Sequence, residues 1–366
     1  MTLATRVGVL TFLHNDNYGS ALQAYALQRA LTALGAEAEH LDYRPSRQEK
    51  LRNLLTSGNS PRLILEGMRK RSVRAQEEGA RQKAASFGPF YAAHMRLSPV
   101  CADHAALKKQ ASQYDLLLCG SDQIWSPTWL NPAYFLDFAA KSQRKTAYAP
   151  SLGVKELPSP RKQAMMRSRL TGFERISVRE AEGGRLLEKL LPGTQIPVMP
   201  DPVCLLRREE WLEMAEHPHR KHPYLLCYFL GESPAYWERV ARLQEKTGLR
   251  VKVIPLTAEA YRQPYDLCAG LSPEQFLGYL DEAAVVCTDS FHGTVFSTIF
   301  QTDFEVFRRD REDDPASRNS RIDNLLRQLE LDSDLAEIPW EAVTSHLAEM
   351  RREGLAYLAS LLEEQR

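Results

Sequence analysis

The chain has 366 residues, more than one hydrophobic core of ordinary size organises, and this length favours two domains. Hydrophobic residues make up 43% and charged residues 26%, a globular composition that excludes a disordered or fibrous chain. The 47 basic residues balance the 47 acidic residues, so nucleic acid, which attracts proteins with a basic excess, is not an expected partner.

The six cysteines are scattered without a C-x-x-C pair, and several stand in apolar runs. We expect them to be free core residues of a protein in the reducing cytoplasm. The apolar run 7–13 is short and leads into polar residues rather than a cleavage site, so it indicates a buried strand and not an export signal. No stretch approaches the roughly 18 to 20 apolar residues of a membrane span.

Short apolar runs alternate with helical patterns along the chain, which predicts parallel sheets covered by helices. The predicted strands are Val7–Phe12, Ala38–Asp42, Tyr114–Cys119, Lys145–Ala149, Arg175–Val178, Tyr224–Leu230, Val251–Pro255 and Ala283–Cys287. The predicted helices are Ala21–Leu34, Pro234–Thr247, Thr294–Phe300 and Trp340–Arg366. Clustered prolines near residue 200 place the crossing between domains there, giving residues 1–198 and 199–366.

Residues 44–95 interrupt the first domain with a basic stretch of broken helical periodicity. The pattern fits an amphipathic helical insertion whose basic face is solvated. It also fits a surface that touches anionic lipid headgroups or a lipid diphosphate acceptor, which would make this a peripheral membrane contact.

Ligands of open α/β sheets bind beyond the carboxyl ends of the strands, so residues in the loops that follow the strands are the first candidates for binding. After the first strand, Asn17, Gly19 and Gln23 suit either an anion cradle or a capped helix without a ligand. After the Tyr114–Cys119 strand, Ser121 and Asp122 are ligand candidates, but Asp122 is equally a helix cap and Trp125 a core residue. Ser151 lies in a third such loop.

Arg179 stands at the end of the Arg175–Val178 strand, where its planar guanidinium can hold a carboxylate or phosphate. The alternative is an ion pair with Glu180 or another acid. His292 lies between a buried strand and a helix that Gly293 begins, a suitable place for a general acid/base that Asp289 or Ser290 orients. A purely structural histidine is the alternative.

Two clusters remain. The histidines of residues 217–222 stand among prolines and cations in a loop, so we predict no metal site there, and no cofactor is expected. Arg318 and Arg321 can reach a phosphate, or their segment can cap a helix that begins near Ile322.

Six motifs occur in the order found in polysaccharide pyruvyl transferases, and the chain resembles that family from Val7 to about Leu326. They are Asn17-Tyr18-Gly19-Ser20-Ala21-Leu22-Gln23-Ala24-Tyr25-Ala26-Leu27, Tyr114-Asp115 with Gly120-Ser121-Asp122-Gln123-Ile124-Trp125, Tyr134-Phe135-Leu136-Asp137-Phe138, Ile176-Ser177-Val178-Arg179-Glu180, Asp201-Pro202 and Thr288-Asp289-Ser290-Phe291-His292-Gly293-Thr294.

The resemblance implies an α/β fold of two Rossmann-like domains that face each other across a cleft, as in GT-B glycosyltransferases. It implies transfer of pyruvate from phosphoenolpyruvate to hydroxyls of a saccharide or lipid-linked saccharide, with ketal formation, in the synthesis of cell-surface or exopolysaccharides. The essential histidine of the family falls on His292 and its strand-end arginine on Arg179, and we expect Asp289 to assist His292.

The residues expected to contact substrate are Asn17, Gly19, Gln23, Ser121, Asp122, Ser151, Ser290, Gly293, Arg318 and Arg321. Ser290-Phe291-His292 stands where many members have Arg-Leu-His, so one donor-binding cation is missing, and Arg318 or Arg321 is its candidate replacement. Ser20 stands where relatives often carry an acid. Two other functions stay open: a GT-B-like glycosyltransferase that uses a nucleotide sugar, and a non-catalytic partner-binding protein.

Overall fold

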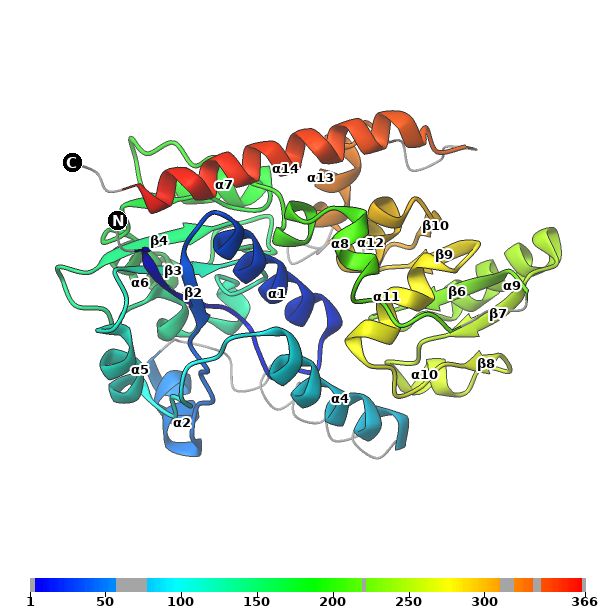
Figure 1. The fold of residues 1–366 in the computed structure, drawn as a ribbon, viewed down its shortest axis with the longest axis horizontal. Helices are drawn as coiled ribbons and strands as arrows, with labels where there is room; N and C mark the ends of the chain where they lie inside the picture. The colour runs from blue at the N-terminus through cyan, green and yellow to red at the C-terminus, as the bar shows by residue number, and fades with distance from the viewer. Residues whose placement is uncertain (1–3, 57–77, 219–221, 310–318, 332–336, 364–366) are drawn as a thin grey trace. The chain divides into compact units, whose positions relative to one another are not determined.

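The computed structural model describes residues 4–56, 78–218, 222–309, 319–331 and 337–363. The chain divides into two compact units: unit 1 comprises Met1–Leu65, Tyr91–Leu205 and Met350–Arg366, and unit 2 comprises Glu66–Phe90 and Leu206–Glu349. Each unit contains one parallel five-stranded sheet with helices packed around it (Figure 1). The predicted α/β class is therefore confirmed.

The sheet of unit 1 has the order β2-β1-β3-β4-β5. Its strands are β1 (Arg6–Leu10), β2 (Glu37–His40), β3 (Leu116–Gly120), β4 (Arg144–Tyr148) and β5 (Arg175–Ile176). All neighbouring strands run parallel. The central strand β3 is buried along its whole length, which explains its continuous apolar sequence.

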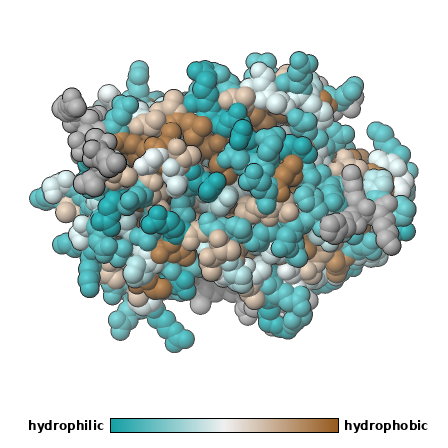
Figure 2. Space-filling model, in the orientation of Figure 1, coloured by the Kyte–Doolittle hydropathy of each residue, from teal (hydrophilic) through white to brown (hydrophobic). Residues whose placement is uncertain are grey.

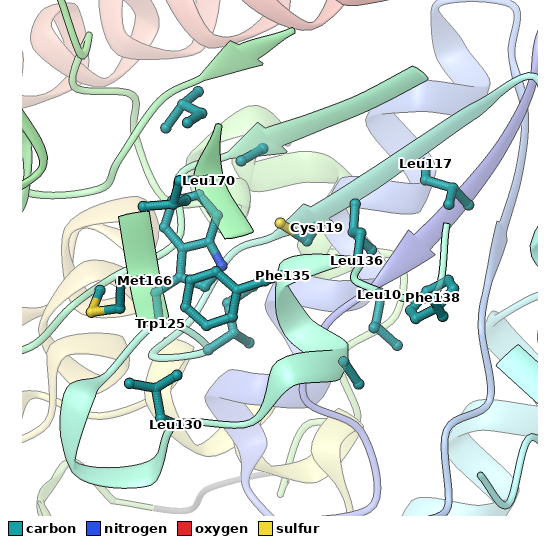
Figure 3. Close-up of a cluster of buried hydrophobic side chains, with 14 of the residues drawn as sticks. Leu10, Leu117, Cys119, Trp125, Leu130, Phe135, Leu136, Phe138, Met166 and Leu170 are labelled. Carbon is teal, nitrogen blue, oxygen red and sulfur yellow. The ribbon is translucent and has the colours of Figure 1, made fainter. Parts of the chain in front are cut away.

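The helices of unit 1 connect these strands and cover the sheet. They are α1 (Tyr18–Ala33), α2 (Arg47–Thr56), α5 (His104–Ala111), α6 (Pro160–Leu170) and α7 (Ala181–Leu190), with 3₁₀ turns at η1 (Pro127–Trp129), η2 (Pro132–Phe135) and η3 (Pro202–Leu205). Trp125 lies in a buried hydrophobic cluster and stacks on Phe135, as Figure 3 shows. Trp125 is thus a core residue, which was one of the two interpretations that the sequence allowed.

The C-terminal helix α14 (Trp340–Leu362) has residues in both units. Tyr357, Leu358 and Leu361 pack in one hydrophobic cluster with residues of β1 and α1. The predicted domain limits, 1–198 and 199–366, assigned this whole helix to the second domain, whereas its C-terminal part packs on the core of unit 1. Periodicity predicts a helix but does not identify the core on which an apolar face packs.

The sheet of unit 2 has the order β10-β9-β6-β7-β8. Its strands are β6 (Tyr224–Tyr228), β7 (Arg250–Val253), β8 (Asp266–Leu267), β9 (Val285–Thr288) and β10 (Asp303–Val306), again all parallel. The edge strands β8 and β10 were not predicted. Both are short, β8 is exposed and β10 is partly exposed, so they lack the apolar run by which buried strands are recognised.

The helices that begin in or belong to unit 2 are α4 (Glu78–His94), α8 (Arg208–Leu212), α9 (Pro234–Thr247), α10 (Ala258–Tyr261), α11 (Pro273–Asp281), α12 (Phe291–Phe300) and α13 (Ser320–Gln328). Helix α12 is buried at every position, consistent with its apolar sequence. The last residues of α4, from Tyr91 onward, belong to unit 1.

The described residues of the predicted basic insertion, residues 44–95, lie mostly in two helices, α2 and α4. Residues 57–77 lie outside the described residues, so the predicted membrane contact stays a prediction. Figure 2 shows mainly hydrophilic side chains on the face in view, with hydrophobic side chains in smaller patches between them. Among the described helices, none combines the length and the apolarity that crossing a bilayer requires. All six cysteines are buried and free, as predicted.

Candidate functional site

The strand order of unit 1 creates a switch point between β1 and β3. The chain leaves β1 toward β2 on one side and leaves β3 toward β4 on the other, so the loops after β1 and β3 diverge at the carboxyl edge of the sheet. Ligands of open α/β sheets bind at such points. The predicted residues Asn17, Ser121 and Asp122 all lie in these two loops.

Side-chain hydrogen bonds join the two switch-point loops of unit 1. The Ser20 hydroxyl donates to Oδ2 of Asp122 at 2.5 Å, and both residues are buried. Nε2 of Gln23 donates to the Thr11 hydroxyl at 3.0 Å, while its Oε1 accepts from the backbone N–H of Ser121 at 3.2 Å. An acid in place of Ser20 would face Asp122 with a like charge, so the hydroxyl suits this chain.

Asn17 caps helix α1. Its Oδ1 accepts from the backbone N–H of Ser20 at 3.1 Å, and Gly19 is buried in the first turn. Of the two predicted possibilities, an anion cradle and a capped helix, the capped helix is therefore present. Asp122 has a φ of 62°, a left-handed conformation that few residues other than glycine adopt, and its Oδ1 accepts from the N–H of Gln123. Substrate contact by Asn17, Gly19, Gln23, Ser121 and Asp122 stays a prediction.

Arg179 lies just beyond β5, and its guanidinium is paired with a carboxylate of the chain. Nη1 donates to Asp201, and Nε lies 4.0 Å from Glu180; the side chains of Arg179 and Asp201 are 3% and 0% exposed. Burial alone would lower the pKa of Arg179, but the carboxylates of Asp201, Asp122 and Glu180 raise it above its usual value. Arg179 therefore forms the ion pair that the sequence left as an alternative, and its partner is Asp201. Its role in holding the donor stays a prediction.

The Asp201 and Glu180 carboxylates extend this network to the other loops. Oδ2 of Asp201 lies 3.4 Å from the Ser121 hydroxyl. Oε1 of Glu180 accepts from the Ser151 hydroxyl at 2.9 Å and from the backbone N–H of Leu152 at 3.0 Å. The predicted residues Arg179, Ser121 and Ser151 are thus brought together through two acids, Glu180, which the sequence named as an ion-pair partner of Arg179, and Asp201, to which it assigned no role.

Unit 2 has its own switch point, between β6 and β9, because the chain leaves β6 toward β7 and leaves β9 toward β10. Asp289, directly after β9, joins the two loops there. Its Oδ1 accepts from the backbone N–H of Leu230 at 2.7 Å and its Oδ2 from that of Gly231 at 2.8 Å. Asp289 therefore fixes the loop after β6, and its predicted assistance to His292 stays a prediction.

His292 lies in the first turn of α12, is 7% exposed, and packs edge to face on Phe291. Ser290 is the N-cap of this helix, and its hydroxyl accepts from the N–H of Gly293 at 3.3 Å. A Cβ at Gly293 would lie 2.4 Å from Oγ1 of Thr288, so only glycine allows the helix to begin this close to β9. The structure thus gives His292 a rigid position at a helix N-terminus, where anions are stabilised.

Arg309, which the sequence analysis missed, supplies a cation at this loop. Nε donates to Oδ2 of Asp289 at 3.0 Å and Nη2 to its backbone carbonyl at 2.8 Å; the Arg309 side chain is 10% exposed. Asn319 accepts from the backbone N–H of Arg309 at 3.2 Å. The signal was available: Arg309 follows the edge strand β10, so recognising that strand would have placed Arg309 at the carboxyl edge of the sheet.

Arg318 and Arg321 are the two arginines predicted to replace the missing cation. Arg321 lies in the first turn of α13, partly buried. Arg318 lies outside the described residues. Asn319 is the N-cap residue of α13, so the segment does begin a helix, two residues earlier than predicted.

Of the histidines at residues 217–222, His217 lies 3.1 Å from Asp281. Within the described residues, no cluster of three or more histidines, cysteines or acids suits a metal ion.

The comparison with protein families gives one match. The sequence profile of a family described as polysaccharide pyruvyl transferase matches residues 17–311, most of the chain. No protein of curated function matches the sequence.

Solved structures resemble the fold at low sequence identity. A Listeria monocytogenes protein assigned as a UDP-N-acetylglucosamine 2-epimerase has a TM-score of 0.52 and 10% identity, covering 98% of this chain and 91% of its own. The UDP-GlcNAc 2-epimerase of Neisseria meningitidis, solved with UDP-GlcNAc, has a TM-score of 0.49 and 10% identity, covering 98% and 94%. The first likeness, together with the two parallel sheets, shows a two-domain Rossmann-like fold of the GT-B kind. The predicted facing of the two domains across a cleft stays a prediction.

Proposed function

Because the chain belongs to the polysaccharide pyruvyl transferase family, a family of enzymes, we propose that it transfers a pyruvyl group from phosphoenolpyruvate to hydroxyls of a saccharide acceptor. The acceptor is a free or lipid-linked saccharide destined for a cell-surface or exopolysaccharide. The observation that carries the proposal is the family match over residues 17–311.

The reaction joins two hydroxyl oxygens of the acceptor to C2 of phosphoenolpyruvate, adds a proton to C3 and releases phosphate. It therefore needs an acid for C3, a base for the hydroxyls and cations or N–H groups for the donor anions. His292 is our candidate for the acid, because it is fixed in the first turn of α12. The N-terminus of that helix favours the donor phosphate or carboxylate.

Arg179, which is buried, and Arg309, which is partly buried, are the candidates for holding the donor. Arg179 is the predicted clamp and would bind a donor anion alongside Asp201. Arg309 supports the proposal in a second way: the chain has Ser290 where many family members have arginine, and Arg309 brings a guanidinium to the backbone of the neighbouring residue, Asp289. This weakens the reason for regarding the chain as non-catalytic.

The experiment is a phosphate-release assay with phosphoenolpyruvate and a panel of lipid-linked saccharides, with the product analysed by mass spectrometry for the ketal. We expect phosphate release that depends on the acceptor. Phosphoenolpyruvate should also raise the melting temperature of the protein, whereas UDP and GDP should not. Stabilisation by a nucleotide together with sugar transfer would contradict the proposal.

His292→Gln tests the assigned acid. Loss of a positioned acid/base lowers kcat by roughly 10²- to 10⁴-fold. Its control is His346→Gln, a histidine in α14 that bonds the backbone carbonyl of Leu329 and should leave kcat unchanged. A His292→Gln enzyme with wild-type kcat would remove His292 from the mechanism.

A further inference from the structure

A histidine–aspartate pair lies at the switch point of unit 1, in residues to which the family resemblance gave no role. Nε2 of His14 lies 2.8 Å from Oδ1 of Asp42. The Arg44 guanidinium binds the same carboxylate through Nε to Oδ1 and Nη2 to Oδ2, each at 2.8 Å. The Asp42 side chain is 4% exposed and that of His14 is 25% exposed, so the acid is buried and the imidazole reaches solvent.

The backbone holds the imidazole in place at some conformational cost. His14 has a φ of 55° and Asp16 a φ of 52°, both in the left-handed region that residues with a side chain rarely adopt. The backbone N–H of His14 points to the Tyr91 hydroxyl at 3.4 Å, and the two rings pack edge to face at 5.0 Å. Such conformations persist where surrounding contacts fix them, and they cluster at functional sites.

The charge of Asp42 determines which nitrogen of His14 carries the proton. Burial would raise the pKa of Asp42, but hydrogen bonds from His14 and Arg44 lower it overall, so Asp42 is ionised at neutral pH. An ionised carboxylate only accepts hydrogen bonds, so Nε2 of His14 must be the N–H donor. The lone pair of the neutral ring is then on Nδ1, which has no hydrogen-bond partner among the described residues.

We propose that His14, oriented by Asp42, is the general base that takes the proton from an acceptor hydroxyl. His14 lies in the loop between β1 and α1, one of the two loops that diverge at the switch point, and Asp42 lies just after the neighbouring strand β2. This inference rests on the function proposed above.

The proposed step moves one proton from the acceptor to His14. The hydroxyl O–H bond breaks and its proton moves to Nδ1 of His14, while the oxygen forms a bond to C2 of the donor and C3 gains a proton. The second hydroxyl oxygen then bonds to C2 as the bond from C2 to the phosphate oxygen breaks, and its proton replaces the one that the acid gave to C3. Two hydroxyl protons are lost: C3 takes up the equivalent of one, and His14 releases the other to solvent, from which the departing phosphate is protonated.

The test compares His14→Gln with His104→Gln in the full-length protein. His104 is a matched control, since it too pairs with an aspartate, Asp137 at 3.4 Å, and its side chain is 28% exposed, but it lies at the start of α5. We expect His14→Gln to lower kcat by roughly 10²- to 10⁴-fold. The stabilisation by phosphoenolpyruvate should remain, because the donor does not depend on this base. His104→Gln should keep wild-type kcat.

Added imidazole separates proton transfer from a structural role. We expect it to restore part of the activity of His14→Ala, since a small base can enter the space left by the ring. Lost activity without rescue, or wild-type kcat in His14→Gln, would overturn the assignment while leaving pyruvyl transfer by the wild type intact. A wild-type protein that transfers no pyruvyl group to any acceptor would instead overturn the proposed function, and the role of His14 with it.

Discussion

The switch points of the two units are built on the same plan but secured differently. Each has a buried aspartate paired with an arginine: Asp201 with the buried Arg179 in unit 1, and Asp289 with the partly buried Arg309 in unit 2. Asp289 also accepts two backbone N–H groups from the loop after β6. In unit 1 the corresponding loops are joined by side chains instead, through Ser20 and Asp122.

This difference shows which carboxylate depends on its arginine. Asp289 keeps strong backbone donors if Arg309 is removed, and the Tyr236 hydroxyl lies 3.4 Å away. Asp201 keeps the N–H of Val203 at 3.1 Å and the more distant Ser121 hydroxyl. A buried carboxylate that loses its charge partner is costly unless hydrogen bonds replace it. The Arg179 side chain is also less exposed than that of Arg309, at 3% against 10%, so the pair in unit 1 is less screened by solvent and unit 1 should be the more sensitive of the two.

The largest expected effect follows from Arg179→Leu. Breaking a buried ion pair by removing one partner costs about 3–5 kcal/mol, and Asp201 is fully buried. Hydrogen exchange measured by mass spectrometry, which reports each unit separately, should show this loss in unit 1. The control is Arg185→Leu, an exposed arginine in α7 paired with Glu182, whose loss should have far less effect. Equal losses in the two variants would refute the buried pair as a source of stability.

Acid should also affect unit 1, through His40. Burial lowers the pKa of His40 from 6.5 to about 4, although its ring donates to the Ala24 carbonyl. The unfolded chain therefore binds a proton at His40 below pH 6.5, whereas the folded unit binds this proton only below about pH 4. The contribution of neutral His40 to the stability of unit 1 is present above pH 6.5 and is lost as the pH falls toward 4, by about 3 kcal/mol in total.

His40→Gln isolates this contribution, because an amide can still donate to Ala24 but does not titrate. Stability of unit 1 between pH 6.5 and 4, measured by hydrogen exchange, should fall less steeply in the variant than in the wild type. Asp42 does not confuse the comparison: its pKa is lowered, so its contribution is lost below its ordinary value of 3.8. An unchanged slope would contradict the prediction.

The sequence predicted the fold well because buried parallel strands carry a strong signal. The strands β1, β3, β6 and β9, which flank both switch points, were all identified from their apolar runs. The edge strands β8 and β10 were missed because their exposed residues leave no such run. The packing of Tyr357 and Leu358 on unit 1 is a long-range contact, and local periodicity contains no information about it.

The site was predicted in part for the same reason. Loops after recognised strands gave Ser121, Asp122, Arg179, Asp289 and His292 at the carboxyl edges. The partners of these residues were missed: Arg309 follows an unrecognised strand, and Asp201 meets Arg179 only through the folded chain. A residue pattern shows where a side chain stands, but it does not show which acid neutralises a given arginine.

Arg309→Leu should have a smaller effect than Arg179→Leu. The variant loses hydrogen bonds from a charged group, worth about 1.5–3 kcal/mol, while Leu230 and Gly231 still donate to Asp289. Faster hydrogen exchange in the loops after β6 and β9 should report this loss of stability. A loss in unit 2 as large as that of Arg179→Leu in unit 1 would show that the backbone donors do not compensate, and the contrast between the two switch points would fail.

The smallest effects should come from the helix caps, which offer one residue at each switch point. Asn17 caps α1 and Ser290 caps α12, each through one side-chain hydrogen bond, at 3.1 and 3.3 Å. Replacing such a cap with alanine costs about 1 kcal/mol. Asn17→Ala and Ser290→Ala should therefore lower the stability of their own units by similar amounts in urea unfolding followed by hydrogen exchange.

The two caps should differ in activity, and this difference is the most direct test of their predicted contact with substrate. A residue that only caps a helix changes stability, whereas a residue that also binds donor changes KM as well. Ser290→Asp keeps the cap but places a negative charge at the N-terminus of α12, where donor anions are expected, so it should raise the KM for phosphoenolpyruvate while preserving the helix. If Ser290→Asp leaves that KM unchanged, Ser290 serves the helix alone and the donor anion binds elsewhere.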